Sequence, residues 1–174
     1  ASHVGTVLLP AGVALAITIA LVGRMTDRVP THVLVSTGLV LLAISFLLNF
    51  GLGLQTPIWV VGLFAILGRI GFGCVLPSLN LGAMRSLPRA LIPQASSAIN
   101  FIRTLGGATG VSLCGIVLEW RLEAHGDSLA IAASSPARLA AFNEAFLMLA
   151  LLSGLALLAA WQLRDPAPAQ PPSR

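Results

Sequence analysis

Five long apolar runs limit what this sequence can fold into. They cover about residues 4–22, 33–50, 58–83, 95–118 and 145–161, and three of them contain no charged residue. A helix of about 20 apolar residues crosses the roughly 30 Å hydrocarbon core of a bilayer. In that medium a spanning segment must satisfy its own backbone polar groups, which an α-helix does. We therefore predict an all-α, polytopic transmembrane bundle of five helices over residues 1–163.

Composition supports the same class and argues against a nucleic-acid partner. Hydrophobic residues make up 56% of the chain and charged residues 9%, with a mean hydropathy of +0.92, whereas about a quarter of the residues of soluble domains are charged. The net charge of +4 comes from ten arginines spread singly or in pairs, so no basic run marks a phosphate-binding surface. The predicted partner is the lipid bilayer. Residues 164–174 are proline-rich and polar, which predicts a disordered tail.

The charged residues between the runs predict the orientation. If five helices alternate, the loops at 23–32 and 84–94, each with two arginines, lie on the same side as the tail. The other side receives the uncharged turn at 51–56 and the net-acidic connection at 119–144. Arginine-rich loops favour the cytoplasmic side. We expect a multi-pass protein of the cell (inner) membrane, with Ala1 outside and Arg174 in the cytoplasm.

Two arginines lie inside apolar runs. Arg69 is near the middle of the third run, and Arg103 follows Asn100 in the fourth. A charge within the membrane is costly, so it usually faces a bundle interior or a transport pathway. We name Arg69, Asn100 and Arg103 as candidates for a substrate or coupling pathway. The structural alternative is that the arginines donate hydrogen bonds to carbonyls of neighbouring helices.

Glycines in the fourth run predict close helix packing. Gly106 and Gly110 form a GxxxG pair, and Gly107 and Gly110 share one helix face with Asn100 and Arg103. Such a pair lets another helix backbone approach closely. In the third run, the glycine-rich stretch at 68–73 and Pro77 indicate a thin, bendable segment of the kind that lines a path. We name Pro77, together with the fourth-run glycines, as a candidate for helix packing.

The sequence offers no pattern for an enzyme, a metal or a cofactor. It contains no HExxH, GxSxG or GxxxxGK[ST] motif, and its three histidines lie far apart. No acidic residue lies inside the predicted spans, so an intramembrane enzyme is not expected, and the proton-binding carboxylate of a pump would lie elsewhere. Since the chain begins at Ala1 without methionine, we expect a piece of a longer protein.

Two stretches resemble one family of membrane transporters. Gly23, Arg24, Asp27 and Arg28 match the G-[RK]-x-x-D-R loop motif that the major facilitator superfamily places after the second helix of each half. The segment ASSAINFIRTLGG at 95–107, after Leu-Pro-Arg at 87–89, is similar to a signature of the fourteen-helix drug:proton antiporters of the EmrB/QacA type. Charges at a helix boundary can form a cluster that holds one conformation of a transporter.

This resemblance implies that the five helices are the last five of the C-terminal six-helix half. The N-terminal half, and the helix whose membrane-embedded acid couples transport to protons, would then lie upstream of Ala1. The implied function is a proton-driven multidrug or metabolite exporter of small amphipathic or cationic compounds, which this chain would not perform alone. Gly23, Arg24, Asp27 and Arg28 would form its cytoplasmic gate. A non-transporting membrane scaffold or assembly partner remains the alternative.

Overall fold

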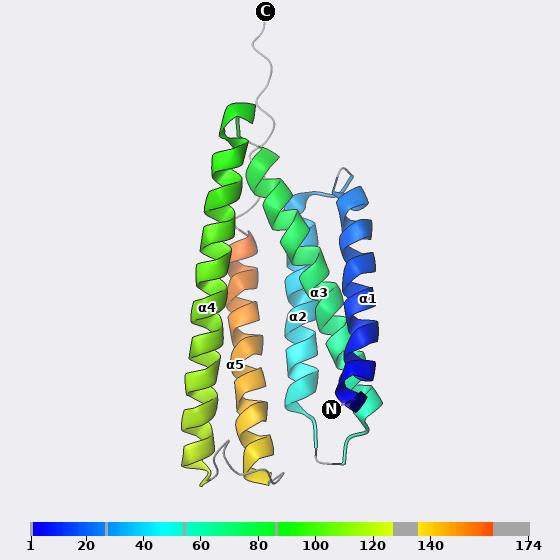
Figure 1. The fold of residues 1–174 in the computed structure, drawn as a ribbon, viewed down its shortest axis with the longest axis vertical. Helices are drawn as coiled ribbons and strands as arrows, with labels where there is room; N and C mark the ends of the chain where they lie inside the picture. Colours follow the sequence, from blue (N-terminus) through cyan, green and yellow to red (C-terminus); the bar gives the residue numbers. More distant parts are fainter. Residues whose placement is uncertain (1, 27, 54, 86, 127–135, 162–174) are drawn as a thin grey trace, which may run out of the picture.

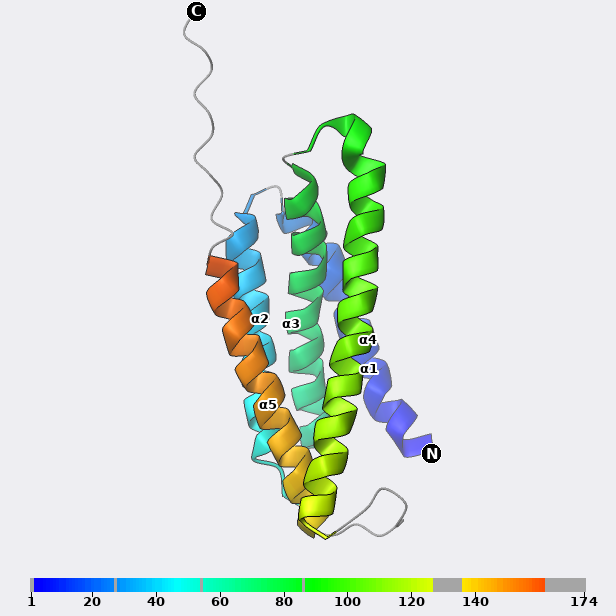
Figure 2. The same ribbon diagram turned by 90° about the vertical axis from the view of Figure 1, so that its left-hand side faces the viewer.

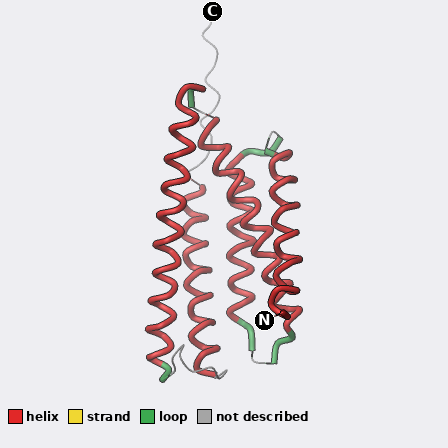
Figure 3. The backbone as a smooth tube through the Cα atoms, in the orientation of Figure 1, coloured by secondary structure: helices red, strands yellow, loops and turns green. Residues whose placement is uncertain are grey.

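The structure is a computed structural model that describes residues 2–26, 28–53, 55–85, 87–126 and 136–161. All regular structure in those ranges is helical (Figure 3). The order is α1 (Ser2–Met25), α2 (Thr31–Phe50), α3 (Ile58–Arg85), the short 3₁₀ helix η1 (Arg89–Leu91), α4 (Ile92–Ala124) and α5 (Pro136–Ala160). The predicted all-α class is confirmed. The expected tail at 164–174 lies outside the described residues.

Among the described residues, four helical segments are long and apolar enough to cross a membrane. They are α2, α3, α4 continued from η1, and α5, whose most apolar stretches have mean hydropathies of 1.5 to 2.3. In α1, the residues whose side chains the structure describes give an apolar stretch over Leu9–Met25. Pro10 lies inside α1 and Pro77 inside α3, and both helices continue past the proline. Lengths and composition thus agree with a transmembrane helix bundle.

Two helices extend beyond the apolar runs that predicted them. α4 continues to Ala124 and α5 begins at Pro136, so both ends of the expected connection at 119–144 are helical. Apolarity marks the part of a helix that lies in hydrocarbon, but adding a polar residue to an existing helix needs no new nucleus. α4 stops where Gly126 takes a positive φ of 71°, a conformation that commonly ends helices.

The helices run alternately in opposite directions (Figure 1). The connections from α1 to α2 and from α3 to α4 lie at one end of the bundle, and the connection from α2 to α3 lies at the other. Arg24, in the last turn of α1, and Arg89, in η1, are therefore at the same end. The opposite end holds the acidic last turns of α4 and the beginning of α5.

Small residues bring α2 and α3 together. A Cβ added to Gly38 would lie 2.6 Å from the carbonyl oxygen of Gly71, and a Cβ added to Gly71 would lie 2.7 Å from the carbonyl oxygen of Gly38. Further along, Ser45 Oγ donates a hydrogen bond of 2.8 Å to the carbonyl oxygen of Phe64. Close backbone approach and hydrogen bonds between helices are what hold bundles together in lipid, where apolar burial gives little.

A glycine of α3 also admits α1. A Cβ on Gly73 would lie 2.9 Å from the Cβ of Thr18 in α1. Thr18 is buried, and its hydroxyl donates to the carbonyl oxygen of Ala14 within its own helix. The glycine-rich stretch at 68–73 therefore makes room for two neighbouring helices, a role that the sequence pattern did not assign to it.

α4 stands apart from this packed group. Leu122 is the one buried residue of α4, near the helix end that meets α5. Figure 2 shows α4 and α5 converging towards that end and separating towards the other. Most of the surface of α4 is therefore exposed in this chain, although its sequence is apolar enough to span a membrane.

Candidate functional site

A groove of about 440 Å³ opens between α2, α3 and α5. Its walls are mainly aliphatic and aromatic, with three polar side chains among them. The lining residues are Leu42, Ser45, Phe46 and Asn49 of α2, Val61, Ala65, Gly68, Arg69 and Phe72 of α3, and Phe146 of α5. Concave, largely apolar sites with a few polar groups are typical of small-molecule binding. Arg69, a sequence-predicted pathway residue, therefore lines this groove.

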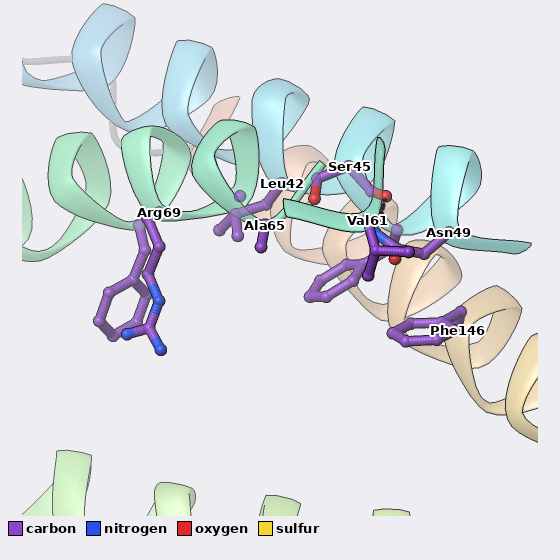
Figure 4. A pocket seen from close by; sticks show the side chains of 10 residues that line it. Leu42, Ser45, Asn49, Val61, Ala65, Arg69 and Phe146 are labelled. Atoms are coloured by element: carbon purple, nitrogen blue, oxygen red, sulfur yellow. Dashed lines mark hydrogen bonds between the residues drawn. The ribbon is translucent and has the colours of Figure 1, made fainter. Parts of the chain in front are cut away.

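Arg69 supplies the only formal charge among the lining residues. Its side chain is exposed and extends from α3 away from α2 (Figure 4). Within the part of the chain that the structure describes, it forms no hydrogen bond or ion pair. The structural alternative, an arginine bonded to the carbonyls of a neighbouring helix, is not realised by the described helices.

The two other polar side chains of the groove are engaged with helix backbone. Ser45 Oγ donates to the carbonyl oxygen of Phe64, and Asn49 Nδ2 donates to the carbonyl oxygen of Ser45 at 2.8 Å. The second of these bonds is the dashed line in Figure 4. Asn49 and Ser45 are both buried. Their bonds hold the α2 wall of the groove in place. Arg69 is the charged residue of the lining, and it has no partner among the described residues.

Asn100 and Arg103 pair with each other on α4. Arg103 Nη2 donates to Asn100 Oδ1 at 2.6 Å, and both residues are exposed. The neighbouring Thr104 hydroxyl donates to the carbonyl oxygen of Asn100 at 2.8 Å, again within the helix. The structure thus confirms that Asn100 and Arg103 share one face. It brings neither of them into the groove lining.

The glycines of α4 lie against no other helix of the described chain. A Cβ added to Gly106, Gly107 or Gly110 would meet no atom within 4 Å. The close packing predicted from their spacing is therefore not made by any described residue. Pro77, the other residue named for packing, is partly buried within α3.

The predicted gate residues lie at the end of α1. Gly23, Arg24 and Arg28 are exposed there, while Asp27 lies outside the described residues. The backbone N–H of Arg28 donates to the carbonyl oxygen of Met25 at 2.9 Å, which makes the loop a tight turn. Arg24, in the last turn of α1, and Arg28, in the turn that follows, therefore lie at the end of the bundle that also carries η1.

Sequence reasoning missed an ionic cluster that joins α4 to α5. Arg121 Nε donates to Glu144 Oε2, and His125 Nε2 lies 3.6 Å from Glu144 Oε1. The guanidinium of Arg121 also lies over the ring of Trp120, 5.8 Å from its centroid. All of these residues fell in the stretch interpreted as a connection. Arg121 and His125 are four residues apart, so a helix would place them on one face, and this spacing was the signal in the sequence that could have indicated the cluster.

The described residues contain no group of three or more His, Cys, Asp or Glu side chains that could hold a metal ion. The three polar side chains in the groove are an arginine, an asparagine and a serine. This set can bind an anion or exchange hydrogen bonds, and it offers no pair of a nucleophile and a base.

Comparison with known proteins identifies the family. The Major Facilitator Superfamily matches residues 1–111. The chain is 29% identical to the multidrug transporter protein MdtP of Bacillus subtilis (strain 168) over 121 residues, or 70% of its length. The match covers 22% of MdtP. The chain is 28% identical over 163 residues, or 93% of its length, to the uncharacterized MFS-type transporter YcnB of the same organism, with 34% of that protein covered. The chain spans about a third or less of these relatives and belongs to the Major Facilitator Superfamily.

Proposed function

We propose that this chain is part of a transmembrane transporter, a proton-driven exporter of small multidrug-type or metabolite compounds. The observation that carries the proposal is the groove with the uncompensated charge of Arg69, found in a chain of the Major Facilitator Superfamily. One similar protein is named as a multidrug transporter. The signature at 95–107 favours the fourteen-helix drug:proton antiporter branch.

The bare face of α4 supports a larger assembly. An apolar helix with one buried residue and four open glycines needs further helices around it, since small residues in membrane helices serve close approach. We assign the five helices to the C-terminal half of the fold, with the partner half supplied by the rest of a longer protein. Gly106, Gly107 and Gly110 would contact that part.

Arg69, Asn100 and Arg103 form the proposed pathway, and the turn at 23–28 forms the proposed gate. Arginine-bearing connections gather at one end of the bundle, which favours a cytoplasmic location for that end. This orientation places Ala1 outside and Arg174 inside. A gate at this end would act by switching between two packings of the bundle. No enzymatic step is proposed.

Transport by the complete parent protein tests the proposal. In inverted membrane vesicles, a pH gradient should drive movement of a fluorescent dye, and collapse of the gradient should stop it. Arg103→Ala, expressed at the same level, should lose the gradient-driven signal, and Arg103→Lys should retain part of it because the charge remains. Lysine has no planar fork, so full recovery is not expected.

Two transport results would contradict parts of the proposal. Equal transport by the parent and by Arg103→Ala would make Arg103 structural and remove it from the pathway. Failure of the unmodified parent to move cationic, neutral and anionic dyes would overturn the exporter assignment. In that case the membrane scaffold would become the better interpretation.

A further inference from the structure

The charge of Arg69 needs an anion that the described chain does not supply. Arginine stays protonated at any physiological pH, so it cannot remove the cost of its charge by losing a proton. The acids that the structure describes are Glu119, Glu123 and Glu144, all near the end where α4 stops and α5 begins. Of these, Glu144 is already held by Arg121 and His125. None of the groove-lining residues is acidic.

The other residues that line the groove indicate the chemistry of the uncharged part of a ligand. Phe72 lies one helical turn further along α3, and Phe146 reaches the same groove from α5 (Figure 4). Aromatic side chains offer apolar contact area to a flat hydrophobic body. A guanidinium binds a carboxylate or sulfonate through two parallel hydrogen bonds, and Arg69 lies at the opposite end of the groove from Phe146 (Figure 4). The groove volume of about 440 Å³ lies in the range of small-molecule sites.

We propose that this groove binds a small amphipathic organic anion. Its carboxylate or sulfonate would contact Arg69, and its aromatic or aliphatic body would lie against Phe72 and Phe146. The proposal rests on the transporter function given above and narrows its substrates to the anionic members of the amphipathic class. It excludes cationic compounds from this groove, because a positive charge beside Arg69 would be repelled and would find no carboxylate there.

Binding to the complete parent protein tests this charge preference. The protein is placed in nanodiscs of zwitterionic phosphatidylcholine and titrated with three probes that share one apolar body: 1-pyrenebutyrate, 1-pyrenebutanol and 1-pyrenebutylammonium. The carboxylate should bind at least about tenfold more tightly than the alcohol, as one charge-assisted bidentate contact would give. The ammonium probe should bind most weakly.

Two arginine variants locate the effect. Arg69→Gln should reduce the affinity for 1-pyrenebutyrate about tenfold or more and leave the affinity for 1-pyrenebutanol unchanged. Unchanged binding of the alcohol also shows that the variant has folded. Arg89→Gln is the matched control, since it removes the same charge from the exposed η1 and should change neither affinity. If Arg69→Gln does not fold, Phe146→Ala should weaken binding of both probes.

Several results would overturn the proposal. Equal affinities for the acid and the alcohol, or equal losses in Arg69→Gln and Arg89→Gln, would show that Arg69 meets no ligand anion. Loss of the preference in nanodiscs containing phosphatidylglycerol would assign the anion to a lipid headgroup instead. The assay uses no gradient, so it separates the two ideas: Arg69-dependent binding without gradient-driven transport would contradict only the exporter function.

Discussion

The glycines of α3 and those of α4 look alike in sequence and differ completely in environment. On α3, Gly71 lies against the backbone of α2, so that an added Cβ would come within 3 Å of two backbone atoms. On α4, a Cβ added to Gly110 would meet no other part of the described chain within 4 Å. Both helices are long and apolar enough to cross a membrane. The contrast shows that a small-residue face indicates the capacity for close packing without naming the helix that uses it.

The same contrast appears in the arginines of the two helices. Arg69 opens onto a groove built by three helices and lacks a partner among the described residues. Arg103 donates one hydrogen bond to Asn100 on its own helix. One charge therefore awaits a group from another molecule or segment, and the other is already partly compensated. This difference is why the ligand proposal rests on Arg69, while Arg103 enters only through the pathway proposal.

The largest expected effect is at the contact between α2 and α3. Gly71→Ala should lower the free energy of unfolding of this chain by about 1–3 kcal/mol, because the new methyl group meets backbone that cannot rotate away. Titration of the purified chain in mild detergent with sodium dodecyl sulfate, followed by helicity, measures the change. Gly115→Ala on α4 is the control and should not destabilise, since nothing lies within 4 Å of the added Cβ. Equal losses would mean that the contact has no special weight.

A second prediction asks whether the open face of α4 is covered in the complete protein. Gly110→Leu should change the unfolding free energy of this chain by no more than about 0.5 kcal/mol. In the parent it should cost about 1–3 kcal/mol, as overpacking against a close helix does. The same detergent titration measures both. Val111→Leu, at an exposed neighbouring position, should be tolerated in either protein. A parent that accepts Gly110→Leu would show that this glycine face is not a helix contact.

The smallest effect is expected where α4 does meet α5. The side chains of Arg121 and Glu144 are 38% and 30% exposed, so solvent screens their attraction. A double-mutant cycle of Arg121→Ala and Glu144→Ala should give a coupling energy of about 0.5–1 kcal/mol, at the upper end for exposed pairs. High salt should reduce that energy. Additive losses in the two single variants would show that the ion pair contributes nothing to holding α4.

Sequence patterns predicted the helices best where the surrounding medium is the hydrocarbon of a bilayer. The runs at 33–50 and 58–83 predicted α2 and α3 closely, because hydrocarbon forces an apolar segment of that length to form a helix. They were less informative at 119–144. There, charged residues suggested a connection, yet α4 continues to Ala124 and α5 starts at Pro136. Outside hydrocarbon, polarity no longer separates a helix from a loop.

The sequence likewise predicted some features of the candidate site and not others. Arg69, Asn100 and Arg103 could be named from the sequence because a charge inside an apolar run is conspicuous. The groove around Arg69 could not be predicted, since Asn49 and Phe146 reach it from helices that are distant in sequence. Neither could the pairing of Gly38 with Gly71, because Gly38 lies in an ordinary apolar run without a GxxxG pattern.

The sequence by itself determined an all-helical membrane chain, the face shared by Asn100 and Arg103, and a resemblance that the family match supports. These follow from hydropathy, from the 3.6-residue period of the helix and from motifs that are local in the chain. Only the tertiary structure decided which glycines make contact, which stay open, and that Arg69 borders a groove. Periodicity places a residue on a face of its helix, and the packing of other helices determines what lies opposite that face.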